Sequence, residues 1–323
     1  MRALQFRAFG DPAKELTLVD LPDPRPRRGW AVVRIRAASV NPSDVKNVEG
    51  QLEGTVLPRV PGRDFSGVVE AGPPDWIGAE VWGTGGDAGF ILDGSHAELI
   101  AIPEAALARK PSRLDHAQAA SVGVTFVVGW MGLADYAALK KGEAVAIVGV
   151  SGGVGGAVAQ LARALGAARV IGIGRRPPAE GSPAASRIDA YVAIEGDVAA
   201  AVRMHTGGHG ADVVFDAVGG VMFEAALGCL AHKGRLIEIA AAGQRRVEFD
   251  LLDFYHNEGR ILGADSRKLD LAASSAILGQ LAPLFDDGRL AAPLIYRTLP
   301  LARGVLAYQA VAAGSQGRIV IEP

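Results

Sequence analysis

The hydrophobic pattern along the chain changes character near residue 111. Before it, short segments such as 31–38 alternate hydrophobic and polar residues and lie between clusters of Gly, Pro and Asp. Alternation with a period of two is typical of strands that bury one face. We expect little helix there beyond residues 42–48, and therefore predict an antiparallel, barrel-like first domain.

After residue 111, helical patterns alternate with short apolar runs. Residues 115–137 are predicted to be helical, with Gly142 ending the segment before the next strand. Six apolar runs are predicted strands, and helical segments lie between them: 144–149, 168–173, 190–194, 212–218, 234–240 and 260–265. This alternation is typical of a doubly wound parallel sheet. One more helix from residue 269 and a β-rich end complete the pattern.

The strand predicted at 144–148 runs into five glycines, at positions 149, 152, 153, 155 and 156, before an apolar helical pattern. A strand, a glycine turn and a helix in this order offer free backbone N–H groups and a positive helix dipole to a phosphate. Glycine also lets the backbone approach the pyrophosphate of a dinucleotide. We predict a dinucleotide site. The alternative is a glycine-rich turn without a ligand, in a chain with 42 Gly among 323 residues.

The residues after the second parallel strand indicate which dinucleotide binds. NAD sites usually carry an acid here, which accepts hydrogen bonds from the ribose 2′-hydroxyl. In this chain Gly174 is followed by Arg175 and Arg176, and a guanidinium suits a 2′-phosphate because it donates in pairs. We predict NADPH as the cofactor, with its selectivity over NADH left open. The alternative is two solvated surface arginines.

Composition narrows the class of protein. The length of 323 residues suggests two domains, and 49% hydrophobic with 21% charged residues fits a soluble enzyme. A net charge of −2 gives no indication of the basic surface that binds nucleic acid. We see neither a signal peptide nor an apolar run of about 18 residues, and expect a cytoplasmic protein without a membrane partner. The single cysteine, Cys229, excludes an internal disulfide and is expected to be a small buried residue.

Seven motifs in a fixed order carry a family resemblance: 38–44 (ASVNPSD), 61–69 (PGRDFSGVV), 94–98 (GSHAE), 123–125 (GVT), 151–155 (SGGVG), 207–216 (GGHGADVVFD) and 234–235 (GR). With them the chain resembles the medium-chain dehydrogenase/reductase superfamily, and most of all its zinc-free quinone oxidoreductase and enoyl reductase branch, which includes zeta-crystallin. The similarity runs from end to end. The motifs are specific for the superfamily and much less so for the substrate.

The resemblance implies an α/β fold. A GroES-like, β-rich catalytic domain would occupy residues 1–117 and 266–323, and a Rossmann domain would be inserted at 118–265. The active site would lie in the cleft between them. The resemblance also implies a homodimer in which the last Rossmann strands of two subunits join into one sheet, with residues 260–265 at or near that edge.

The resemblance further implies a set of cofactor contacts. The nicotinamide end would lie by Asn41 and Thr125. The pyrophosphate would lie on the turn formed by Ser151, Gly152, Gly153 and Val154. The 2′-phosphate would lie by Arg175 or Arg176 and by Tyr191. Ala240 to Gly243, residues 262–265 and the stretch from Gln316 to Arg318 would flank the cofactor.

Zinc alcohol dehydrogenases carry a cysteine after the strand near residue 38, and His-Glu where this chain has Arg63 and Asp64. Here Asn41 lies in the first region with no cysteine near it, and the four-cysteine structural zinc lobe is absent. We therefore predict no metal. Arg63 is expected to form an ion pair with a neighbouring acid; the alternative is a role facing the cleft, toward an anion or a carbonyl.

The family pattern of catalytic residues is incomplete in this chain. Val48 and Leu52 stand where many quinone reductases of this branch have Arg and Tyr, so a tyrosine that donates to a substrate carbonyl is missing. Charge that develops on a reduced enone or quinone needs a hydrogen-bond donor. Our candidates are Asn41, then Ser43 and Lys46, with water supplying the proton. The alternative for Asn41 is a turn cap.

Four other residues have mainly structural expectations. Asp44 and Asp64 are expected to fix turns and backbone N–H groups. Asp216 lies at a strand end, where it either faces the ligand crevice or caps the next turn. Tyr255 is expected to pack in the core rather than to close the pocket.

Together these observations predict an NADPH-dependent, zinc-independent reductase of a small quinone or α,β-unsaturated carbonyl. One alternative is a reductase of enoyl-CoA-type thioesters, for which the candidate contacts to the CoA phosphates are Arg245, Arg246, Arg267 and Lys268. The other is an NADPH-binding protein with little catalysis, serving in redox sensing or structure.

Overall fold

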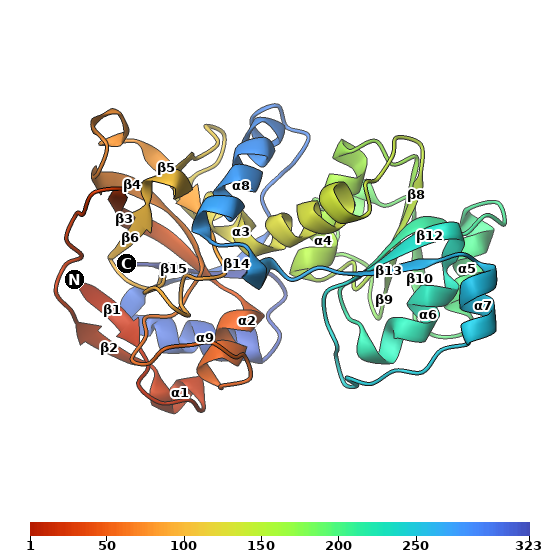
Figure 1. Cartoon of the computed structure of the whole chain (residues 1–323), viewed down its shortest axis with the longest axis horizontal. Coiled ribbons are helices and arrows are strands. Elements are labelled where there is room, and N and C mark those ends of the chain that lie inside the picture. The colour runs from red at the N-terminus through yellow and green to blue at the C-terminus, as the bar shows by residue number, and fades with distance from the viewer. The chain divides into compact units, whose positions relative to one another are not determined.

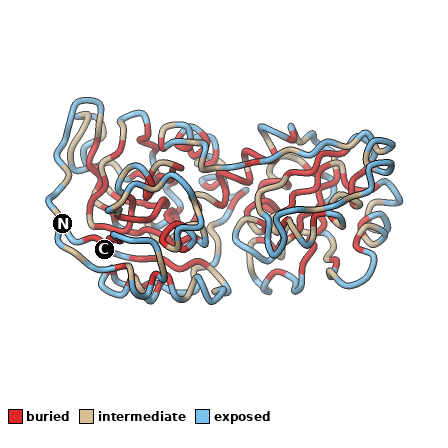
Figure 2. The backbone as a smooth tube through the Cα atoms, turned by 60° about the horizontal axis from the view of Figure 1, so that its bottom comes forward, coloured by how far each residue is buried: buried red, intermediate tan, exposed pale blue.

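The computed structural model describes residues 1–323, which divide into two compact units (Figure 1). The first comprises Met1–Val124, Ser266–Gly288 and Ala292–Pro323, and the second comprises Thr125–Asp265 and Arg289–Ala291. The division falls at Thr125, inside helix α3 (His116–Trp130), whereas the inserted domain is predicted from residue 118. In each unit the buried residues concentrate along the sheet (Figure 2).

The first unit is built on an antiparallel sheet, as predicted. Its strands run in the order β14-β15-β3-β4-β5-β7, with β6 also paired to β3, and only β14 and β15 are parallel. The bounds are β3 (Trp30–Val40), β4 (Asp64–Ala71), β5 (Glu80–Gly83), β6 (Leu99–Pro103), β7 (Ala108–Arg109), β14 (Ile295–Pro300) and β15 (Arg318–Glu322). A separate hairpin pairs β1 (Arg2–Gln5) with β2 (Thr17–Asp20). The register sets Ser39 of β3 beside Asp64 of β4 and Val320 of β15.

Four helical segments of the first unit pack on this sheet through apolar side chains: α2 (Pro42–Val48), the first part of α3, α8 (Leu271–Asp286) and α9 (Gly304–Ala312). The short helix α1 (Pro12–Glu15) packs against α9 and α2 instead. Val45 and Val48 of α2 share a buried cluster with Tyr308 of α9 and with Phe6. Proline at the first position of α2 is favourable, because a helix start leaves that N–H unbonded anyway. Helix α2 therefore begins directly after Asn41 and holds it at the sheet.

The second unit is a six-stranded parallel sheet in the order β10-β9-β8-β11-β12-β13. The bounds are β8 (Ala144–Val148), β9 (Arg169–Gly174), β10 (Ala190–Ala193), β11 (Ala211–Asp216), β12 (Leu230–Glu238) and β13 (Arg260–Gly263). All six predicted strands are present, although β12 begins at Leu230 rather than at 234. The strand order reverses between β8 and β11, and ligands of such sheets bind outside the carboxyl ends at that point.

Helices cover both faces of the parallel sheet. One face carries α5 (Val198–His205) and α6 (Phe223–Gly228), whose apolar residues pack with Val214 and Leu236. The other carries α4 (Gly153–Ala164) and a π-helical turn (Met131–Tyr136), in which Gly132 lies against Phe215 and Ile237. Helix α7 (Leu251–His256) is mostly exposed. Short 3₁₀ turns lie at Pro74–Trp76, Glu104–Ala106, Ala185–Arg187, Gly220–Met222, Ser266–Lys268 and Leu301–Arg303.

The structure tests three further expectations from the sequence. Cys229 is fully buried, as predicted. Tyr255 is 56% exposed, so the expectation of core packing is wrong: α7 turns this side chain outward. The stretch His116–Tyr136 is long and apolar enough to cross a membrane by length and composition alone, contrary to the expectation that no such run exists. Of an 18-residue apolar window within that stretch, 72% is buried inside the protein, as in a core helix.

Candidate nucleotide and catalytic sites

The turn after β8 has the geometry of a phosphate-binding turn. Gly149 has a φ of 81°, in the left-handed region that favours glycine. A Cβ on Gly155 would lie 2.2 Å from the carbonyl oxygen of Gly149, so only glycine permits this close approach. Helix α4 has no side-chain cap, which leaves the N–H groups of its first turn available. The residues predicted at the pyrophosphate, Ser151, Gly152, Gly153 and Val154, form this turn, and the first three are exposed.

The end of β9 presents the two predicted arginines to solvent. Arg175 and Arg176 are exposed directly after Gly174, and neither has an ion-pair partner within the chain. Tyr191 lies on the neighbouring strand β10, and its hydroxyl donates a hydrogen bond to the carbonyl of Gly174. The structure therefore brings Tyr191 to the strand end that carries both arginines. No acid follows β9 at this position.

The carboxyl ends of β11 and β12 carry two acidic residues on one face of the sheet. Asp216 and Glu238 are register partners on neighbouring parallel strands. Asp216 is fully buried, and its Oδ1 accepts hydrogen bonds of 2.8 Å from the backbone N–H groups of Val218 and Gly219. The turn cap considered for Asp216 is therefore confirmed, and a position facing the ligand crevice stays a prediction.

Sequence reasoning missed Glu238. Both of its carboxyl oxygens are buried without a hydrogen-bond partner. Burial and the negative charge of Asp216 raise the pKa of Glu238 to about 8; the backbone N–H of Ala240 is near enough to oppose this weakly but lies outside hydrogen-bonding geometry. A signal for it exists in the sequence, since Glu238 is an acid inside the otherwise apolar end of a parallel strand.

The segments that follow β11 and β12 pair with each other at this edge. Ala242 donates a 2.9 Å hydrogen bond to the carbonyl of Val218, and Gly219 forms a bridge with Ala241. A Cβ on Gly219 would lie 1.9 Å from the carbonyl oxygen of Ala240 and 2.5 Å from Oε1 of Glu238. Of the two residues predicted to flank a cofactor here, Ala240 is partly buried in this pairing and Gly243 is exposed.

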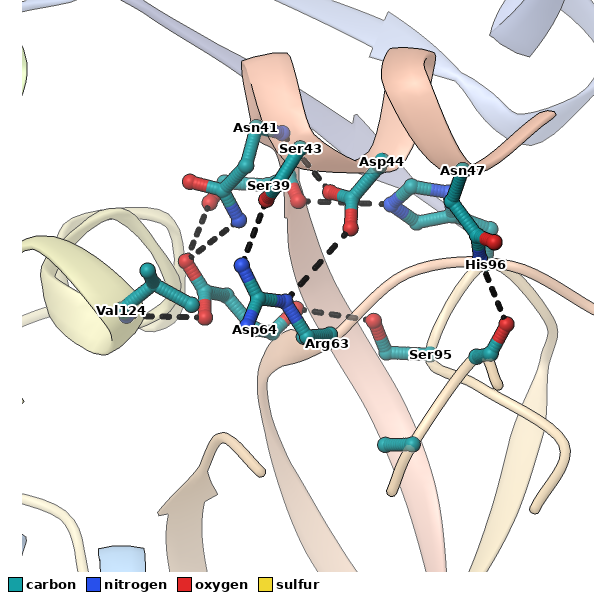
Figure 3. A network of polar contacts seen from close by, with 12 residues as sticks. Ser39, Asn41, Ser43, Asp44, Asn47, Arg63, Asp64, Ser95, His96 and Val124 are labelled. Atoms are coloured by element: carbon teal, nitrogen blue, oxygen red, sulfur yellow. Dashed lines mark hydrogen bonds and ion pairs between the residues drawn. The ribbon is translucent and has the colours of Figure 1, made fainter. Parts of the chain in front are cut away.

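In the first unit, Asn41 is part of a buried polar network (Figure 3). The expected roles of Asp44 and Asp64 in fixing backbone N–H groups are confirmed in it, whereas the contacts of Arg318 were not foreseen. Its Nδ2 donates to Oδ2 of Asp64 at 2.9 Å, and its Oδ1 accepts from Arg318 at 2.9 Å. Arg318 also donates to Asp64 at 3.2 Å, and the backbone N–H of Val124 donates to the other oxygen of Asp64 at 3.0 Å. Ser39 accepts from Arg318 and lies 3.3 Å from Asp64. The side chain of Asn41 is therefore held from two sides.

Arg63 links the same region to helix α2. Its Nε lies 3.8 Å from Oδ1 of Asp44, and its Nη2 donates to the hydroxyl of Ser43. The expected ion pair of Arg63 with a neighbouring acid is confirmed. Burial raises the pKa of Asp44 to about 6 against the opposing charge of Arg63, and Asp44 accepts the N–H of Asn41 at 2.8 Å. Lys46, the third catalytic candidate, is exposed on α2.

His96 occupies the interior of the first unit as a neutral group. Its Nδ1 lies 2.8 Å from the hydroxyl of Tyr308, and its Nε2 lies 3.3 Å from the carbonyl of Ser39. Burial lowers the pKa of His96 to about 4. This histidine supports the strand that carries Ser39.

Two residues predicted at the cofactor lie outside these clusters. Thr125 is 4% exposed and begins the second unit within α3. Gln316 is exposed in the turn before β15 of the first unit. Their approach to a nicotinamide stays a prediction.

The side chains at the positions where zinc dehydrogenases carry ligands do not fit a zinc ion. Asn41 is committed to Asp64 and Arg318, and Arg63 brings a second cation to the region. Zinc binds thiolate, imidazole and carboxylate ligands, usually four together. No group of three or more His, Cys, Asp or Glu side chains in the structure could hold a metal.

Three loops of the first unit meet around Arg267. Its guanidinium lies 4.5 Å from the ring centroid of Phe90 and donates to the carbonyl of Glu53. Val56 donates to the carbonyl of Phe90 at 3.0 Å, which ties residues 51–57 to residues 87–93. Val56 and Ile91 are 57% and 62% exposed, so this group of loops presents apolar side chains. Arg267, a candidate for CoA phosphates, is instead engaged in holding the loops together.

Comparison with known families assigns both parts of the chain. Residues 27–112 match the alcohol dehydrogenase GroES-like domain, and residues 153–277 match the zinc-binding dehydrogenase family. The zinc in the second description is said of the family and not of this chain.

Individual relatives cover most of the chain. A zinc-type alcohol dehydrogenase-like protein of Schizosaccharomyces pombe is 35% identical over 85% of this chain and 81% of its own length. The human quinone oxidoreductase is 28% identical over 81% of this chain and 79% of its own. A crystal structure described as an NAD-dependent alcohol dehydrogenase superposes with a TM-score of 0.88 at 29% identity, over all of both chains.

Proposed function

Since the chain belongs to the medium-chain dehydrogenase/reductase superfamily, in its quinone oxidoreductase branch, we propose that it is an NADPH-dependent reductase of a quinone or an α,β-unsaturated carbonyl. The observation that carries the proposal is the exposed glycine turn between β8 and α4, at the point where the strand order reverses. NADPH would supply the hydride when bound, and the protein would position the acceptor and polarise its carbonyl group. Hydride and one proton from water together reduce the acceptor by two electrons.

The residues of the second unit fit a dinucleotide phosphate. The N–H groups of Ser151, Gly153 and Val154 would receive the pyrophosphate, because they have no partner within the chain, whereas the N–H of Gly152 donates to the carbonyl of Gly149 at 2.9 Å. Arg175 and Arg176 would pair with the 2′-phosphate, which their exposed and unpaired guanidinium groups can reach. The absence of an acid after β9 supports NADPH over NADH.

The donors for the substrate oxygen would come from the first unit. Asn41 gives one N–H to Asp64, and an amide carries two. The hydroxyl oxygen of Ser43 accepts from Arg63, so its own O–H is free to donate. Either group can stabilise negative charge that develops on a carbonyl oxygen. Lys46, exposed outside this network, is the least supported of the three candidates.

The turn can be tested by one substitution. Gly155→Ala would push a methyl group into the carbonyl of Gly149, and should weaken NADPH binding roughly a hundredfold or more, by calorimetry. Gly279→Ala is the matched control, because a Cβ there meets no neighbour within 4 Å. Unchanged affinity in Gly155→Ala would contradict the proposal. The double variant Arg175→Ala/Arg176→Ala should lose affinity for NADPH and not for NADH.

Substrate assays separate the three functional hypotheses. Consumption of NADPH with 1,4-benzoquinone or 9,10-phenanthrenequinone is the expected result. Faster consumption with crotonyl-CoA would favour the thioester alternative, for which the exposed Arg245 and Arg246 remain available. Binding of NADPH without turnover of any acceptor would favour the alternative of a binding protein.

We also propose zinc independence, because the buried guanidinium groups and the amide offer no zinc ligands. Activity should survive dialysis against EDTA and 1,10-phenanthroline, with less than one equivalent of zinc by elemental analysis. Restoration of lost activity by added zinc would contradict this.

A homodimer in the cytoplasm is proposed with the same function. Strand β13 ends the parallel sheet with only one partner, and apolar side chains near it are exposed: Leu251 (66%), Leu252 (52%), Tyr255 (56%) and Ile261 (37%). An unpaired edge strand is a template for pairing with another chain. Light scattering should give the mass of a dimer, and Ile261→Asp should give a monomer. Ile77→Asp, on an exposed residue of the other unit, is the control.

A further inference from the structure

Asp216, which is fully buried, and Glu238, whose carboxyl oxygens are buried, form an acid pair at the carboxyl edge of the parallel sheet. The two residues are in register on β11 and β12, and their side chains project from the face that carries α6. Three of their four carboxyl oxygens, Oδ2 of Asp216 and both oxygens of Glu238, are buried without a hydrogen-bond partner. Two ionised carboxylates cannot share a desolvated site at low cost, so such pairs hold a proton.

The surroundings of the pair contain no compensating cation. Residues 217–221 and 239–243, which pack over it, carry no ionisable side chain, and Gly263 of β13 has none. On the helical face, Glu224 of α6 is exposed. Burial raises the pKa of the Cys229 thiol to about 12, so this thiol stays neutral. Asp197 and Arg203 of α5 act electrostatically on Cys229, not on Glu238.

The fold places the pair beneath the nicotinamide half of a bound dinucleotide. In a doubly wound sheet the pyrophosphate lies at the turn after the first strand, here β8, and the adenosine ribose at the end of the second, here β9. The other half of the molecule then extends over β11 and β12. That half changes charge in the reaction: the dihydronicotinamide ring of NADPH is neutral, and the ring of NADP⁺ is a cation.

We propose that Asp216 and Glu238 hold one proton between them and release it to solvent when the cationic ring of NADP⁺ binds, so that the pair sets a pH-dependent preference between the two cofactor forms. This rests on the proposed function. A cation above the pair favours its doubly ionised state, whereas a neutral ring does not. Glu238 is a positioning residue here: its oxygens lie under Gly219 and contact neither solvent nor a cofactor directly.

The test compares binding of NADPH and NADP⁺ between pH 6.5 and 9.3, by calorimetry on the full chain. The wild type should gain affinity for NADP⁺ relative to NADPH by roughly fivefold to tenfold over this range, the scale of one charge pair in a partly screened interior. Ionisation of the 2′-phosphate is common to both cofactors and cancels in the ratio. Calorimetry in two buffers of different ionisation enthalpy should show proton release on binding NADP⁺ near pH 7.5, and none on binding NADPH.

Glu238→Gln is the decisive variant, because it keeps the shape and removes the titration. In this variant the ratio of the affinities for NADP⁺ and NADPH should not change with pH, and binding of NADP⁺ should release no proton. Glu224→Gln should behave as the wild type. A flat ratio in the wild type, or an unchanged slope in Glu238→Gln, would overturn the inference. If Glu238→Gln does not fold, Glu238→Leu takes its place.

Unfolding of the protein without cofactor separates this inference from the proposed function. An unfolded glutamate ionises near pH 4.3, whereas the folded pair keeps its proton to about pH 8. The wild type should therefore lose stability relative to Glu238→Gln as pH rises between these values, and no further above them. If neither cofactor binds at any pH, the proposed function falls and the redox preference with it. Parallel unfolding curves of wild type and variant would overturn the shared proton alone.

Discussion

The two units of this chain bury acidic residues in opposite ways. In the first, Asp64 is fully buried and pairs with Arg318. Its carboxylate accepts further hydrogen bonds from Asn41, Ser39 and the backbone N–H of Val124. In the second, Asp216 and Glu238 face each other's charge with no cation nearby and with three oxygens unpartnered.

We infer from this difference that the compensated acid serves the fold and that the uncompensated pair serves a site. A buried ion pair with full hydrogen bonding is stable as a unit and costly to break. A pair of like charges is stable only if one of them stays neutral, and such perturbed groups concentrate at functional sites. In our proposal the acid pair lies beneath a bound ligand. The ion pair with its network holds α2, β4 and β15 together and positions the candidate donor Asn41. The same substitution should therefore act differently in the two regions.

Removing the acid of the first unit should have the largest effect. Asp64→Ala leaves the buried Arg318 without its counter-charge and should lower the free energy of unfolding by about 3–5 kcal/mol. Urea denaturation at pH 7 measures it. A loss below 1 kcal/mol would show that the network is not a unit. The paired change Asp64→Leu/Arg318→Met, which removes both charges, should recover much of the loss.

The next effect is the response of the first unit to acid. His96 has a folded pKa of about 4 and an unfolded value near 6.5, so the unfolded chain binds the extra proton between these values. Stability from neutral His96 is present above pH 6.5 and is lost as pH falls toward 4. The difference in unfolding free energy between wild type and His96→Gln should shrink by about 2–3 kcal/mol from pH 7 to pH 4. Asp44 titrates in both proteins and cancels; a constant difference would contradict the prediction.

The second unit should show the reverse response on the alkaline side. Glu238→Leu removes an acid that the fold keeps protonated, and should raise the free energy of unfolding at pH 8 by about 1–2 kcal/mol. Thermal denaturation at pH 5 and pH 8 checks the sign, because the gain should appear mainly at pH 8. If Glu238→Leu instead destabilised the protein at both pH values, Glu238 would have a structural role like that of Asp64.

The smallest effect is expected at an exposed pair. Arg34 and Glu70 form an ion pair on the sheet of the first unit with side chains 39% and 41% exposed. Glu70→Ala should change stability by about 0.5 kcal/mol or less at pH 7, because solvent screens the charges. Chemical denaturation in 0.1 and 1 M NaCl gives the comparison. A loss as large as that of Asp64→Ala would remove the distinction between exposed and buried charge.

Features encoded within a short stretch of sequence were predicted well. The six strands from Ala144 to Gly263, the glycine turn and the exposed arginines after β9 follow from local periodicity and local backbone requirements. Arg63 was expected to form an ion pair with a neighbouring acid, and that acid is Asp44 of helix α2. Tyr255 was misjudged because an aromatic side chain alone does not tell which way a short helix turns its faces.

Features that depend on distant residues could not be predicted. Arg318 meets Asn41 across 277 positions of sequence because β15 pairs with β3, and no local pattern specifies that pairing. Glu238 stands out in the sequence only as an acid in an apolar strand, and register alone places it beside Asp216 under Gly219.

By itself, the sequence determined the order of strands and helices, the phosphate turn and the family, because each depends on neighbours along the chain. Only the tertiary structure decided which buried charges are compensated. That depends on which strands become neighbours, and the free energy of a buried charge is set by the groups a few ångströms away in space.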